Sequence, residues 1–309
     1  MDPMNAGWTY ADRIGTDASG QPALAFYAAR YRHSSETVWR ERMARGEITR
    51  RGLPVAPDHP LAAGDVLEWR RPPWEEPPVP VEIPILYEDD TVLAVDKPAG
   101  LPVLPDGGYL EHTLVFLLRG RAGGDAPPVP VHRLGRGTSG VLLLARSAAA
   151  RRHLGAQFRR ATAAGGETVL RKDYRALTSA VAGLPDAIEI RQPIGPVPCA
   201  RLGTVHAASP AGRPARSRCR VLARRDGAML WAIELITGRP HQIRIHLASI
   251  GAPLLGDPFY GPGGLPRPGG DALPGDIGYT LRACSLRCVH PLTGRPIEIH
   301  APIPPELQP

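Results

Sequence analysis

The sequence predicts an α+β protein whose main domain is built around a largely antiparallel β-sheet. From residue 85 onward, short apolar segments with strand-like composition recur along the chain. Two or three helical segments interrupt them, and many strands with few helices are typical of this fold class. The chain has 309 residues, of which 43% are hydrophobic. That length and composition allow one large packed core, or one large and one small domain.

Residues 1–22 are polar and irregular, so we expect an N-terminal tail there. Residues 23–72 predict a small compact domain that begins with two helices. In the first helix, four apolar residues fall on one face: Leu24, Tyr27, Ala28 and Tyr31. Ser35 is an expected N-cap of the second helix, and Gly46 is an expected stop.

Short strands follow at 47–55 and 65–70 and complete this small domain. The next segment, 73–84, is rich in proline, which cannot donate to a strand ladder. We therefore expect a semi-rigid linker there, and the main domain over residues 85–305.

The main domain contains seven segments with strand composition, at 85–98, 141–146, 173–179, 217–223, 228–237, 281–289 and 296–301. One expected helix starts after Ser147 and buries Leu154 and Phe158. Another follows Pro240 and ends at Gly251, because its apolar residues have helical spacing.

The composition indicates which kind of partner the protein binds and in which cellular compartment it works. The formal net charge of +7 favours a polyanionic partner, with nucleic acid first, although abundant arginine is also typical of a GC-rich genome. No apolar run reaches the length of a membrane-spanning helix, and no signal pattern opens the chain. Four cysteines without metal-ligand spacing fit reduced thiols. We therefore expect a cytoplasmic protein that does not bind a membrane.

The segment VHRLGRGTSG, residues 131–140, is basic and rich in glycine, yet contains no carboxylate. It is not a P-loop, because Val141 and Leu142 stand where Lys and Ser or Thr are required. It also lacks the spacing of a serine hydrolase elbow. A zinc site is disfavoured as well, because His241 and His246 are five residues apart.

Two further polar clusters accompany this loop. In RKDYRAL, Lys172 and Tyr174 are two residues apart and fall on the same face of a strand. The second cluster, TGRPHQIRIHL, contains Arg239, Gln242 and Arg244. A tyrosine with several arginines suits stacking on a base and binding of backbone phosphates. Each residue taken singly is more often structural.

Together these blocks resemble the RluA-type family of RNA pseudouridine synthases. Five segments match in order, at 92–103, 131–146, 171–177, 237–261 and 281–304. The resemblance covers about residues 85–305 and implies that family's catalytic fold. Residues 23–72 resemble a diverged S4-type RNA-binding unit.

The resemblance implies isomerisation of uridine in ribosomal or transfer RNA to pseudouridine by a monomer, without cofactor or metal. The target base would leave its stack. Tyr174 would then pack on the base, Arg244 would pair with the catalytic Asp, and Arg133 would enter the RNA helix. Further RNA contacts are expected from His132, Arg136, Arg239, Gln242 and Lys172, and from Arg40, Arg45 and Arg50 of the S4-like unit, although charged residues there are also typical of a solvated helix face.

One departure from the family concerns catalysis itself. The family motif is HRLD, and its essential Asp is replaced here by Gly135, which has no side chain to attack or to abstract a proton. A replacement carboxylate is the first alternative, with Asp106 as the leading candidate and Glu111 or Asp257 as weaker ones. The second is an inactive RNA-binding protein or RNA chaperone.

A third alternative is a different activated group, such as Tyr174 or a water, and a fourth is an assembly factor that reuses the fold. A buried Arg244 without its Asp would cost about 3–5 kcal/mol, which favours a replacement partner.

Overall fold

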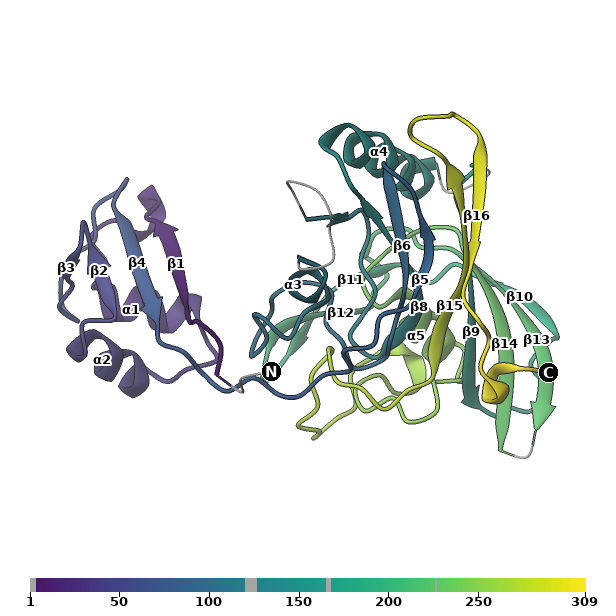
Figure 1. Ribbon diagram of the computed structural model, residues 1–309. Coiled ribbons are helices and arrows are strands. Elements are labelled where there is room, and N and C mark those ends of the chain that lie inside the picture. Colours follow the sequence, from purple (N-terminus) through teal and green to yellow (C-terminus); the bar gives the residue numbers. More distant parts are fainter. Residues whose placement is uncertain (1–3, 120–126, 165–167, 226) are drawn as a thin grey trace. The chain divides into compact units, whose positions relative to one another are not determined.

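The computed structural model describes residues 4–119, 127–164, 168–225 and 227–309, and the chain divides into two compact units, Met1–Glu76 and Pro77–Pro309. Figure 1 shows both units. No helix in the described ranges is long and apolar enough to span a membrane.

The first unit packs two helices, α1 (Ala23–Arg30) and α2 (Glu36–Ala44), with a four-stranded antiparallel sheet. The strands lie in the order β1 (Trp8–Arg13), β4 (Val66–Arg71), β2 (Ile48–Arg50) and β3 (Leu53–Pro54). Its core is aromatic and includes Tyr27, Trp39 and Trp69.

The expected tail at 1–22 is therefore corrected, because Trp8–Arg13 pair with β4 along their whole length. This segment looks irregular in the sequence because it is an edge strand, which is paired on one side and largely exposed. The predicted caps are confirmed. The Ser35 side chain accepts a hydrogen bond from the Val38 amide, and Gly46 has a φ of +70° after the last turn of α2.

The second unit confirms the predicted α+β class with a largely antiparallel sheet (Figure 1). Eight strands follow in the order β10 (Ala187–Ile190), β13 (Ser217–Arg225), β14 (Ala228–Leu235), β9 (Arg171–Ser179), β15 (Leu281–Val289), β8 (Thr138–Ala145), β6 (Val92–Lys97) and β5 (Ile85–Glu88). β16 (Pro296–His300) pairs with β15, and β7 (Val129–Pro130) pairs with β8. β8 and β15 run parallel.

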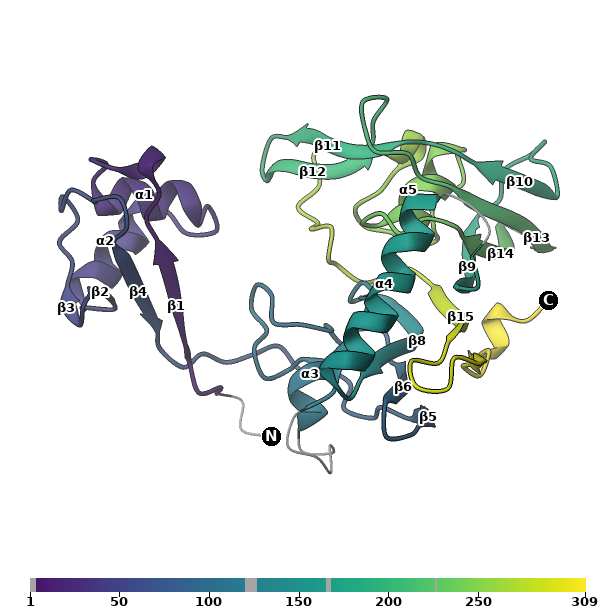
Figure 2. The ribbon, with the colours of Figure 1, turned by 90° about the horizontal axis from the view of Figure 1, so that it is seen from above.

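Helices cover the two faces of this sheet around β8. α4 (Ala148–Ala164; Figure 2) packs on the face that carries Val141 and Leu143, through Leu154. α5 (Gln242–Ser249) packs on the other face, where Ile243 and Leu247 share a core with Leu142 and Leu144. Ser147 caps α4 as predicted, since its hydroxyl accepts a hydrogen bond from the Ala150 amide.

A two-stranded hairpin, β11 (Ile194–Cys199) with β12 (Gly203–Ala208), packs against the remaining side of α5. Residues 242–248 of α5 are consequently all buried, including Gln242, Arg244 and His246. The helix is held on every side, so its polar side chains must find partners within the protein. α3 (Leu114–Leu117) is a single turn near the start of this unit.

Candidate active site

The glycine-rich loop 131–140 links β7 to β8, and the side chain of Lys97 holds it in place. The fully buried Lys97 ammonium donates hydrogen bonds to the carbonyls of Pro98 and Leu101, at 2.8 Å each, and of Arg136, at 3.2 Å. The Gly100 amide donates to the same Arg136 carbonyl. Burial lowers the pKa of Lys97 to about 7. These contacts hold the loop in one conformation beside β6.

His132, predicted to contact RNA, is engaged inside the protein. Its ring stacks on Phe158, and its Nε2 accepts a hydrogen bond from the Leu143 amide of β8. Burial lowers the pKa of His132 to about 3, so the ring is neutral near pH 7. The structure thus assigns His132 to fixing the loop on the sheet.

Arg136 also ties the loop to other segments. Its guanidinium donates to the carbonyl of Gly275, to the carboxylate of Asp276 and to the hydroxyl of Tyr109. Its charge is thus partly offset by Asp276. Arg133, by contrast, is exposed and makes no ion pair with the described residues.

Arg244 lies at the centre of the site, and Asp257 is its partner. Its Nε and Nη2 donate to the two oxygens of the Asp257 carboxylate at 2.7 and 2.8 Å, and both side chains are at most 3% exposed. Burial opposes ionisation of Asp257, but the hydrogen bonds and charge of Arg244 outweigh it and hold the pKa of this carboxyl below its usual value.

The replacement partner expected for Arg244 is therefore present, and it is Asp257, one of the weaker candidates, rather than Asp106. The signal for this lies in the segment DPFY, where the Asp257 carboxylate also accepts hydrogen bonds from the amides of Phe259 and Tyr260, a turn that fixes its orientation.

Asp106 is placed away from this ion pair. It is exposed on a tight turn, in which its backbone pairs with that of Tyr109. No contact joins its carboxylate to Tyr174 or Arg244 among the described residues. Since Asp257 pairs with Arg244, the Asp106 carboxylate is not needed as its partner.

Tyr174 lies on β9 in the core beneath the loop. It shares a hydrophobic cluster with Leu134 of the loop, Ile243 of α5 and Tyr279, and is 7% exposed. Burial raises the pKa of Tyr174, so its phenol stays protonated near neutral pH. Lys172 lies on the same face of β9, as predicted, and is also buried, with its pKa lowered to about 8.

Gln242, expected to bind RNA, is corrected to an internal clamp. It is 2% exposed, its amide oxygen accepts from Thr237 Oγ1 and the Arg239 amide, and its nitrogen donates to the Arg216 carbonyl and Ser217 Oγ. These bonds use its donors and acceptors within the protein. Arg239 donates through Nε to the Pro214 carbonyl and is partly exposed.

The three arginines expected to bind RNA in the first unit are all in ion pairs. Arg40 pairs with Glu36, Arg45 with Glu47 and Arg50 with Asp65. Each guanidinium remains more than one third exposed. Such surface pairs are weak and leave the guanidinium accessible to another anion.

The sequence interpretation missed Tyr279, which lies beside both Gly135 and Arg244. A Cβ atom on Gly135 would lie 3.3 Å from the Tyr279 hydroxyl oxygen, and one on Gly137 would lie 2.8 Å from its ring. The Arg244 guanidinium packs on this ring at 4.3 Å and on the Tyr260 ring at 4.8 Å. A tyrosine before a strand gives no sequence signal for such a position.

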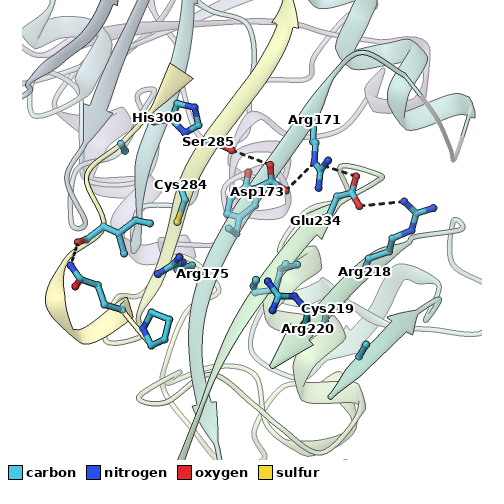
Figure 3. Close-up of a pocket in the computed structure, with 18 of the residues that line it drawn as sticks. Arg171, Asp173, Arg175, Arg218, Cys219, Arg220, Glu234, Cys284, Ser285 and His300 are labelled. Carbon is cyan, nitrogen blue, oxygen red and sulfur yellow. Dashed lines mark hydrogen bonds and ion pairs between the residues drawn. The ribbon is translucent and has the colours of Figure 1, made fainter. Parts of the chain in front are cut away.

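A separate groove with a volume of 1110 Å³ lies over β9, β13 and β14 (Figure 3). Asp173 and Arg175 lie on either side of Tyr174 in β9 and therefore point to the opposite face of the sheet. Ion pairs connect Arg171, Glu234 and Arg218 across the groove. The charges of these three residues are thus paired. Tyr174 also borders the groove, but Arg244, Asp257 and the loop 131–140 do not line it.

The residues around this site match a known family of enzymes. Residues 91–249 match the family model of RNA pseudouridylate synthases. The chain is 46% identical to an uncharacterised RNA pseudouridine synthase of Synechocystis, over 92% of this chain and 94% of that protein. It is 38% identical to RNA pseudouridine synthase 5 of Arabidopsis thaliana, over 99% and 95%.

The fold is also similar to that of a solved structure, human RNA pseudouridylate synthase domain containing 1. The TM-score is 0.58 at 23% identity, over 75% of this chain and 89% of that chain. The family model and the two relatives confirm the resemblance. This chain belongs to the RluA-type family of RNA pseudouridine synthases, which are isomerases that act on RNA.

Proposed function

We propose that this protein converts uridine to pseudouridine in structured RNA, ribosomal or transfer, although Gly135 replaces the family's catalytic Asp. The observation that carries the proposal is the buried Arg244–Asp257 pair. Arg244 packs on Tyr279, which shares a core cluster with Tyr174 and with Leu134 of the loop. A buried pair of this kind is costly to desolvate, and its presence beside the loop supports a site that is still used.

The exposed guanidinium of Arg133 supports RNA entry beside this loop. It makes no ion pair with the described residues. The pKa of the neighbouring His241 is lowered chiefly by burial and by Arg244, and the positive charge of Arg133 adds to this effect. A free cation at the rim of the site suits a phosphate contact or entry into the RNA helix, while Tyr174 lies below for the base.

The first unit is proposed as an S4-like RNA-binding domain. Its accessible arginines, Arg40, Arg45 and Arg50, would contact the phosphate backbone and add affinity that depends on salt. We expect each Arg→Ala variant to weaken RNA binding without changing the maximal rate of the reaction.

An inactive RNA-binding protein is the second candidate, and the absence of a side chain at Gly135 favours it. Mapping pseudouridine in RNA from cells with and without this gene separates the two. The proposal predicts at least one uridine that is modified only when the gene is present, and identical maps would contradict it.

A further inference from the structure

We propose that Tyr279 is a catalytic residue of this site and that its hydroxyl acts where Gly135 leaves the site without a side chain. The inference rests on the proposed function and deepens it. The first observation is steric. Tyr279 Oη lies 3.3 Å from the Cβ position of residue 135, and its ring lies 2.8 Å from the Cβ position of residue 137.

Neither glycine is needed for its backbone conformation, because both have φ values that other residues adopt. A side chain at 137 would collide with the Tyr279 ring, whereas the absence of one lets the ring lie against the loop. The two glycines of HRLGRG therefore leave room for the Tyr279 ring. The position of the family's Asp, residue 135, lies beside the Tyr279 hydroxyl.

Two loops hold Tyr279 and Asp257 on Arg244. Gly256 and Gly278 pass backbone to backbone, since a Cβ on Gly256 would lie 2.0 Å from the Gly278 carbonyl oxygen. Asp257 directly follows Gly256, and Tyr279 directly follows Gly278. Arg244 thus receives the carboxylate from one loop and the ring, at 4.3 Å, from the other.

The loop that carries Tyr279 is also fixed to the rest of the site. Arg244 donates to the Pro274 carbonyl, and Arg136 of the glycine-rich loop donates to Gly275 and Asp276. Among the described residues, no hydrogen bond engages the Tyr279 hydroxyl itself. Tyr279 is 7% exposed, and its hydroxyl is positioned through its ring, with no protein partner among the described residues to compete with a substrate for its proton.

This hydroxyl can donate a proton to the uracil base and later take one back from it. When the bond between ribose C1′ and uracil N1 breaks, its electron pair stays on the base, and N1 takes the Tyr279 proton. The base then turns, which brings C5 to the former place of N1. The C5–C6 double-bond electrons form the new C1′–C5 bond, and the phenolate removes the proton from C5. The proton ends on N1 and the double bond is restored, so no co-reactant is consumed.

Arg244 suits this role because a guanidinium beside the ring stabilises the transient phenolate. Its own charge is compensated in the resting site by Asp257.

The test is release of tritium from RNA that contains uridine labelled at C5. Tyr279→Phe removes one oxygen and should lower kcat by about 10²-fold or more, as for loss of a general acid or base, with RNA affinity changed less than about twofold. Tyr87→Phe is the matched control. Its hydroxyl binds Asp89 at the β5 edge, and it should keep the wild-type rate. Melting curves establish that each variant is folded.

A second variant separates proton transfer from packing. Difluorotyrosine at position 279 keeps the hydroxyl but makes the phenol more acidic, so the pH–rate profile should move to lower pH. An unchanged profile, or a Tyr279→Phe rate within about twofold of wild type, would overturn the proposal. Loss of activity in Asp106→Ala with Tyr279→Phe unaffected would also overturn it and give the role to Asp106. A wild type that releases no tritium contradicts the proposed function as well.

Discussion

Replacing Asp257 by Asn tests how the buried charge of Arg244 is stabilised. The carboxylate accepts two hydrogen bonds from the guanidinium and two, at 2.9 Å each, from the amides of Phe259 and Tyr260. Asparagine keeps the size of the side chain but removes the charge and presents an NH₂ group to the guanidinium. With the Arg244 and Asp257 side chains 3% and 1% exposed, water cannot compensate.

The expected loss in the free energy of unfolding is about 3–5 kcal/mol, the usual cost of leaving one buried charge without its partner. Asp276→Asn is the matched control. Its pair with Arg136 is 36% and 24% exposed, so the loss should stay below about 1 kcal/mol.

The measurement has to report on the second unit alone, because a chain with two units need not unfold in one step. Hydrogen exchange of peptides from β9 and β14, followed over a range of urea concentrations, does so. A loss of less than about 1 kcal/mol for Asp257→Asn would contradict this expectation and indicate that another group compensates Arg244.

Three further predictions concern the loop and its surroundings. Gly137→Ala should destabilise the second unit by about 1–3 kcal/mol, because the added Cβ overlaps the Tyr279 ring. In the background of Tyr279→Ala the same change should cost less. If urea denaturation shows that the two losses in unfolding free energy simply add, the contact is contradicted. Burial lowers the pKa of His132 to about 3 from 6.5, so only the unfolded chain gains a proton between these values, and stability should fall as pH falls through this range. In His132→Gln the stability should fall less steeply as the pH falls. A slope equal to that of the wild type would argue against a contribution from His132. Arg133→Ala should weaken RNA binding and reduce the slope of log affinity against log salt by about 1, whereas Arg171→Ala, on the opposite face, should leave the slope unchanged.

Local signals in the sequence predicted the local structure well. Ser35 and Ser147 marked helix starts because an N-cap acts within three residues of itself. Lys172 and Tyr174 were placed on one face because strand periodicity needs no tertiary information. The edge strand β1 was missed, since it pairs along its whole length with β4, more than fifty residues away in the sequence.

The contacts of the site depend on tertiary structure and could not be predicted. The sequence interpretation placed Arg244 and Gln242 in the site, but their partners come from separate loops and strands. Gln242 looked like an RNA contact because nothing in HQIRIHL reveals that α5 is buried on every side by the sheet and by β11 and β12. The proximity of Tyr279 to Gly135 depends on two loops that meet through Gly256 and Gly278.

The most direct test of the account is whether the purified wild-type protein forms pseudouridine. The protein is incubated with RNA from cells that lack this gene, labelled with tritium at C5 of uridine, and the released tritium is counted. We expect release in proportion to enzyme and time, with pseudouridine at a defined site. RNA binding with no tritium released above the level without protein would contradict it.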